Sequence, residues 1–173
     1  MVHQGKTVVK TFRIDQKTLE ALHDEARKQQ ISLNTFVYQV LTNYCEFERY
    51  HRQMRSVMFT HETFTEILKE LSEDQVREAG RRTGKSVPEA LIISKHGKMT
   101  VNGVIDLIRS EAAATDQFAY SEIIENEHWT ITLTHEFGRK WSVWLASCFY
   151  EAFFVAGVKV HYTVSDHSTT FSL

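Results

Sequence analysis

The chain has 173 residues, of which 42% are hydrophobic and 24% are charged, with a single proline. These values exclude a disordered or linker-rich chain, and no apolar run reaches the roughly 18 to 20 residues that a membrane span requires. The formal net charge is -2, but residues 1–55 hold nine lysines and arginines against six acids, so positive charge is concentrated at the N-terminus.

The first predicted element is a short strand at residues 7–15, TVVKTFRID, where apolar and polar side chains alternate. Phe12 and Ile14 would point to one face of this strand. The opposite face would carry Val9, Thr11 and Arg13. Because no partner strand follows within about fifty residues, we expect the segment to pair with a second copy in a two-stranded antiparallel ribbon. The sequence therefore predicts a homodimer.

Two helices are predicted after the strand. Residues 16–29 carry one narrow apolar stripe at helical spacing, formed by Leu19, Leu22 and Ala26. Ser32 and Asn34 are good N-cap residues, and a second apolar stripe starts at Phe36. Neither helix nor the strand could bury enough apolar surface alone, so we expect two copies to share one core.

The order TFRID, KTLEALHDEA and ISLNTFVYQVL resembles the ribbon-helix-helix family of DNA-binding repressors over about residues 7–50. The family often places glycine before the turn between the helices, where this chain has Gln30. The resemblance implies a DNA-binding domain at residues 1–50. It also implies a homodimeric transcriptional regulator whose partner is double-stranded DNA.

The family inserts the outward face of the ribbon into the major groove, which assigns base contacts to Val9, Thr11 and Arg13. These residue types suit the task, because arginine can bind guanine with two hydrogen bonds, threonine can donate or accept, and valine can contact a thymine methyl. Free amides at the start of the second helix would hold a phosphate, and two lysines would add positive charge. The predicted phosphate-binding residues are Lys6, Lys10, Ser32, Leu33 and Asn34.

A helical connector is predicted at residues 51–90. The second helix would run on to Met58, and another helix would span residues 61–71 before a cap at Ser72. Residues 79–86, AGRRTGKS, fit a loose phosphate-loop pattern, but they follow a charged helical run rather than a buried strand. We interpret them as a solvated basic loop in which glycines interrupt the helix.

The third region, residues 91–173, is predicted to be an α/β domain used for oligomerisation or ligand sensing, which makes the fold class α+β overall. WTITLTHE predicts a strand, GRKWSVWLASCFYEAFFVAG a helix, and KVHYTVSD and STTFSL two further strands. The helix is rich in aromatic residues, so we expect burial against the sheet. It would also form either a second dimer contact, with a tetramer as one outcome, or the wall of a small-molecule effector pocket. Both cysteines, Cys45 and Cys148, are expected to be reduced core residues.

Several histidines surround the proposed sheet: His128, His135, His161 and His167, with Glu136 beside them. Their spacing matches no metal-binding motif, so we expect no metal and no cofactor. Nickel-responsive members of the resembled family carry closely spaced ligands that have no counterpart here. The polar first ten residues lack the apolar core of a signal peptide, and we expect a cytoplasmic protein.

Three functions compete at this point. The first is a sequence-specific DNA-binding regulator, which the N-terminal pattern and the charge distribution favour. The second is an antitoxin or adaptor whose C-terminal part binds another protein, although antitoxin tails are commonly disordered before binding. The third is an enzyme that uses Lys85 or the histidines, and we expect no enzymatic activity because the surrounding motifs are missing.

Overall fold

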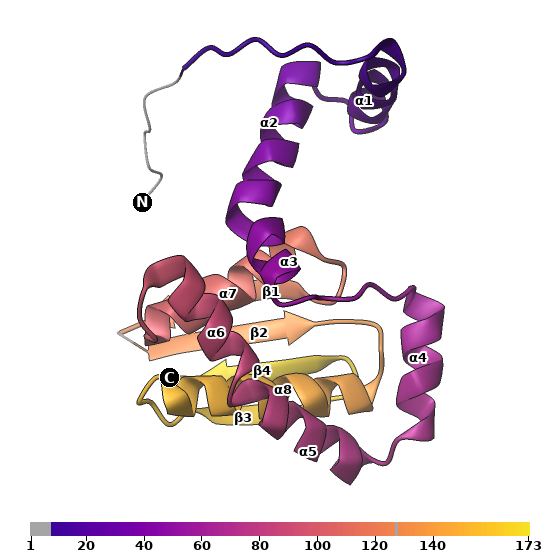
Figure 1. The fold of residues 1–173 in the computed structure, drawn as a ribbon. Coiled ribbons are helices and arrows are strands. Elements are labelled where there is room, and N and C mark those ends of the chain that lie inside the picture. Colours follow the sequence, from indigo (N-terminus) through magenta and orange to yellow (C-terminus); the bar gives the residue numbers. More distant parts are fainter. Residues whose placement is uncertain (1–7, 127) are drawn as a thin grey trace. The chain divides into compact units, whose positions relative to one another are not determined.

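A computed structural model describes residues 8–126 and 128–173 of the chain (Figure 1). The fold combines helices with one antiparallel sheet, so the predicted α+β class is confirmed. The chain divides into two compact units, with the boundary between Tyr44 and Cys45. The segment 51–90 therefore lies inside the second unit.

The first unit contains helices α1 (Gln16–Lys28) and α2 (Leu33–Asn43), which confirms both predicted helices. Asp15 caps α1 by accepting a hydrogen bond from the backbone amide of Thr18 at 2.9 Å. Residues 8–15 precede α1 without regular secondary structure. A single chain provides no partner for a strand at this position, so the intersubunit ribbon stays a prediction.

The turn between α1 and α2 is a Schellman motif built on Gln30, which adopts a left-handed φ of 56°. The amide of Ile31 donates to the carbonyl of Ala26 at 3.0 Å, and the amide of Gln30 donates to that of Arg27 at 3.1 Å. A non-glycine residue is strained in this conformation. Gln30 thus occupies the backbone position for which glycine is best suited.

The helical path continues from α2 through η1 (Tyr44–Glu48), a π-helical segment, into α3 (Arg49–Gln53). A second Schellman motif ends α3, since the amide of Ser56 donates to the carbonyl of His51 and Arg55 has a φ of 55°. The prediction that this helix runs to Met58 is wrong. Met58 lies beyond the helix and is almost fully exposed.

The second unit is organised around a four-stranded antiparallel sheet in the order β1-β2-β4-β3 (Figure 1). The strands are β1 (Ala119–Glu125), β2 (His128–Thr134), β3 (His161–Val164) and β4 (Ser168–Ser172). Helix α8 (Arg139–Val155) connects β2 to β3. The predicted strand-helix-strand-strand order is confirmed, but β1 was missed, and the antiparallel pairing makes this unit α+β rather than α/β.

Helix α8 packs between the sheet and helix α5 (Glu73–Gly84), and most of its residues are buried. Gly80 and Gly84 lie inside α5 and face α8 so closely that an added Cβ would come within 2.7 Å of the Trp144 carbonyl oxygen and 2.2 Å of that of Cys148. The prediction that the two glycines interrupt the helix is wrong for Gly80, whereas Gly84 is the last residue of α5. They allow two helices to approach each other, and residues 79–84 are helical rather than a loop.

Three more helices complete the second unit: α4 (His61–Glu70), α6 (Val87–His96) and α7 (Val101–Ala114). The predicted helix near residues 61–71 is confirmed, and Ser72 caps α5 as expected, with Gln75 closing a capping box. The expectation for the cysteines holds for one residue only, because Cys148 is buried and Cys45 is exposed. Cys45 directly follows the unit boundary, in the π-helical segment η1, which has no buried residue.

Candidate nucleic-acid interface

The first unit has almost no core of its own. Ala26, at 2% exposure, is the one buried residue among its described residues. Phe12 is 70% exposed and Ile14 is 50% exposed, although the sequence pattern assigns both to an inner face. Large apolar side chains of α2 are exposed as well: Tyr38, Val40 and Leu41. Exposed apolar side chains that cluster in this way are typical of interaction surfaces.

Helices α1 and α2 contact each other along a limited seam. Between them lies an open hollow lined by three apolar residues, Ala21, Leu22 and Phe36, and by three polar ones, Lys17, Thr18 and Glu25. Leu19, Leu22 and Phe36 are only partly buried, so the apolar stripes predicted from the sequence face one another incompletely. The hollow offers room for apolar side chains from outside the chain.

Positive charges in this unit fall into two groups. Arg27 and Lys28, at the end of α1, form exposed ion pairs with Asp24 and Glu25. In contrast, three cations form no ion pair within residues 8–126 and 128–173. They are Lys10, Arg13 and Lys17. They all lie on the extended segment or the first turn of α1, where they are exposed and free to meet an anion.

The start of α2 has the geometry of an anion site. The Ser32 hydroxyl oxygen accepts a hydrogen bond from the Thr35 amide at 3.1 Å, which confirms Ser32 as the N-cap. Leu33 and Asn34 occupy the first two helical positions, so their amides have no carbonyl of a preceding helical turn to bind. The positive end of the helix dipole lies at the same place.

The remaining predicted contact residues are placed as follows. Val9 is 92% exposed, and Thr11 and Arg13 are exposed with it, on the segment that precedes α1. Lys6 lies outside the described residues. Lys17 was not among the contact residues predicted from the sequence. It becomes a candidate because it is exposed and forms no ion pair with a described residue.

The competing catalytic candidates in the second unit do not form a recognisable site. Lys85 follows the end of α5 and is exposed, with no phosphate-binding loop around it. Among the described residues, no three His, Cys, Asp or Glu side chains are close enough to hold a metal ion.

His135 is the one sheet histidine that is buried, and its contacts resemble a serine-histidine pair at first sight. Its Nε2 lies 2.7 Å from the Ser142 hydroxyl oxygen. However, its Nδ1 accepts a hydrogen bond from the Phe137 amide at 3.2 Å, so the proton is on Nε2 and is donated to Ser142. An imidazole in this tautomer cannot deprotonate the serine. Burial, with a smaller effect from His167, lowers the pKa of His135 to about 4.

Comparison with models of known families, with curated proteins and with solved structures gave no match. Within the described ranges, the helices are too short or too polar to cross a membrane.

Proposed function

We propose that the protein is a sequence-specific regulator that binds double-stranded DNA as a homodimer through its first unit. The observation that carries this proposal is the combination found in residues 8–44. Exposed apolar side chains lie on the same short segment as cations that form no ion pair with any described residue. Such a segment is suited to fold on dimerisation and then to meet phosphate groups.

In the proposed complex, residues 8–14 of two copies pair as an antiparallel ribbon. Pairing would satisfy the backbone groups of this segment and would bring Phe12 and Ile14 against the helices of both copies. The outward side chains would then enter the major groove and read bases: Val9, Thr11 and Arg13.

Phosphate contacts in this complex come from two places. The amides of Leu33 and Asn34, with Ser32 as the cap, would bind one backbone phosphate at the start of α2. Lys10 and Lys17 would add charge beside the ribbon, together with Lys6. Contacts of this kind fix the position of a protein on DNA without reading sequence.

The test starts with selection of bound sites from random double-stranded DNA by the full chain. A pseudo-palindromic or tandem site is expected, because two copies read two half-sites. Changing Arg13→Ala should weaken binding to the selected site by about 1 to 3 kcal/mol and relax the preference at one base position. Gel-shift titration on the selected site and on single-base variants measures both effects.

Arg27→Ala is the matched control, because Arg27 lies in the same unit but forms an ion pair with Asp24. This variant should keep the base preference of the unchanged chain. Lys17→Ala should weaken binding to all sequences alike and reduce the salt dependence by about one phosphate contact. If Arg13→Ala leaves affinity and selectivity unaltered, the base-reading assignment is wrong.

The antitoxin or adaptor function gains no specific support. Its C-terminal segment would be expected to fold on a partner, whereas residues 128–173 form β2, α8, β3 and β4 around a buried core. A regulatory or oligomerising role suits this folded unit better. Such a regulator would act in the cytoplasm, where the DNA is accessible.

A further inference from the structure

A cavity of about 90 Å³ lies inside the second unit, between α6, α7 and α8. Its walls are mostly apolar and aromatic. They include Pro88, Leu107, Phe118, Trp144 and Phe149. This volume is well above what a single water molecule needs, so the cavity has room for a small ligand.

Glu111, on α7, is the one charged residue that lines this cavity, and its side chain is only 15% exposed. Its Oε1 lies 3.0 Å from Nε2 of His51. Within residues 8–126 and 128–173, its second carboxylate oxygen forms no hydrogen bond. The negative charge also reaches the neighbouring thiol, because burial and, to a smaller extent, Glu111 raise the pKa of Cys148.

This combination selects a class of ligand. An apolar chain would be stabilised against the apolar and aromatic walls, and a cationic group would be attracted by the Glu111 carboxylate. An anion would be repelled by the carboxylate. A neutral molecule of the same shape would fill the space but would lack the charge-assisted hydrogen bond.

We propose that this cavity binds a small alkylammonium ion, with its apolar chain among the aromatic residues and its ammonium group donating a hydrogen bond to Glu111. The proposal assigns a ligand site to the second unit.

The contact between Glu111 and His51 links the cavity to the helical segment that precedes the second unit's other helices. His51 lies on α3 and stacks on Phe47 of η1, with the ring centroids 4.0 Å apart. α3 follows η1 and α2 without an intervening loop. An ammonium ion that competes with His51 for Glu111 would therefore alter the anchoring of the helical segment that leads back to the first unit. This regulatory consequence rests on the proposed function, whereas the binding site does not.

The binding test uses the full chain and three probes of equal length: n-butylammonium, n-butanol and n-butyrate. We expect n-butylammonium to bind saturably and at least about tenfold more tightly than n-butanol, because a hydrogen bond to a charged group is stronger than a neutral one. Butyrate should not bind. Amide chemical shifts in an NMR titration should change around Leu107, Glu111 and Phe149.

Two pairs of variants test the location. Val87→Phe would fill the cavity from its rim and abolish binding, whereas Ile93→Phe adds the same ring to an exposed position of the same helix and should not. Glu111→Gln should reduce the affinity for n-butylammonium to that for n-butanol. Glu89→Gln, a residue of α6 that does not line the cavity, should keep the difference.

The outcomes separate this inference from the proposed function. Equal binding of the ammonium ion and the alcohol to the unchanged chain would overturn the ligand class, and no saturable binding would overturn the site. Binding of n-butylammonium by a chain that binds no DNA would contradict only the proposed function. If both bind, saturating n-butylammonium should shift the DNA affinity of the unchanged chain and not that of Glu111→Gln.

Discussion

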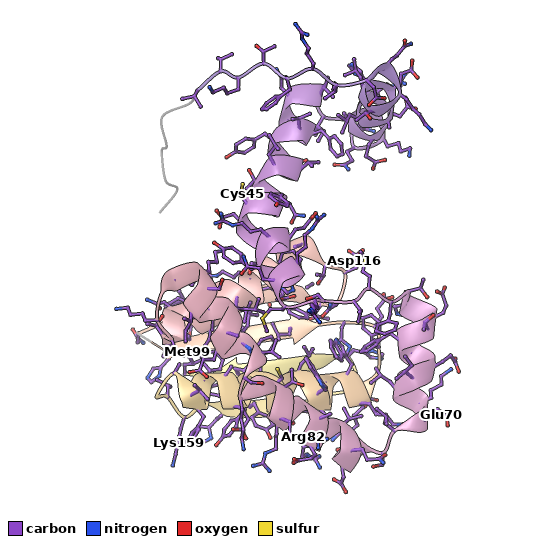
Figure 2. All side chains as sticks on the ribbon, in the orientation of Figure 1. Cys45, Glu70, Arg82, Met99, Asp116 and Lys159 are labelled. Carbon is purple, nitrogen blue, oxygen red and sulfur yellow. The ribbon has the colours of Figure 1, made fainter. Side chains whose placement is uncertain are left out.

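Apolar side chains on helices are buried to very different extents in the two units. In the second unit, α8 is covered by the sheet on one side and by α5 on another, and its apolar residues belong to a continuous core. Figure 2 draws the side chains of both units on the ribbon. In the first unit, α1 and α2 bury only Ala26 within the described chain. Apolar periodicity therefore specifies a surface to be covered, and the number of elements in the unit decides whether the chain itself covers it.

Because the second unit buries a histidine in its core, we expect its free energy of unfolding to decrease when the pH is lowered. His135 is held neutral, with its pKa lowered to about 4, whereas the unfolded chain takes up this proton near pH 6.5. The unfolded state thus binds more protons between these values. The free energy of unfolding of the second unit should be unaffected by this group above pH 6.5 and should fall by up to about 3 kcal/mol as the pH decreases to 4.

Tryptophan fluorescence measures this effect selectively, because Trp129, Trp141 and Trp144 all lie in the second unit. Urea unfolding curves, monitored by tryptophan fluorescence at several pH values between 7 and 4, should give the pH dependence of the free energy of unfolding. An NMR titration should find the imidazole of His135 in the folded protein still neutral at pH 5. A folded imidazole that titrates near pH 6.5 would contradict the prediction.

The close approach of α5 and α8 should be the next most sensitive feature. Gly84→Ala would place a Cβ far inside contact distance of the Cys148 backbone. We expect the second unit to lose about 2 kcal/mol, because overpacking costs about 1 to 3 kcal/mol and the better helix propensity of alanine offsets only part of this. Arg82→Ala, an exposed change on the same helix, should alter stability by less than about 0.5 kcal/mol. Similar values for both variants would show that the glycine is not needed for packing.

A smaller and opposite effect is expected in the first unit. Gln30→Gly should stabilise it by about 1 kcal/mol, because glycine adopts the left-handed φ of 56° without the strain that a side chain imposes. Gln29→Gly is the matched control, since Gln29 has an ordinary φ of -83° and glycine should not stabilise there. Amide hydrogen exchange of α1 and α2 at fixed protein concentration measures both. Stabilisation by both glycines, or by neither, would contradict the role of Gln30.

Periodicity and caps predicted the local elements well. Leu19, Leu22 and Ala26 marked α1, Ser32 and Ser72 marked helix starts, and the alternation after Trp129 marked β2. The predictions that were wrong concern features that depend on contacts between residues distant in sequence. Gly80 and Gly84 are unfavourable for a helix by local propensity, and only the approach of α8 explains them.

Other parts of the structure had no distinctive local signal. β1 was missed because its sequence AYSEIIE, at the edge of the sheet, does not alternate cleanly. The end of α3 was missed because Arg55, not glycine, takes the left-handed position. The cavity beside Glu111 could not be predicted, since it is formed by residues from several helices that only the fold brings together. The predicted DNA contacts at Val9, Thr11 and Arg13 are exposed and stay predictions.

The central claim is that residues 8–44 complete their core only with a second copy. An isotope-filtered NOE experiment on a mixture of labelled and unlabelled chains tests this claim most directly. We predict NOEs between copies from Phe12 and Ile14 to α1 and α2, together with backbone contacts between the two segments that contain Thr11. The claim would be contradicted if residues 8–44 showed no NOEs between copies, or if such NOEs were confined to the second unit.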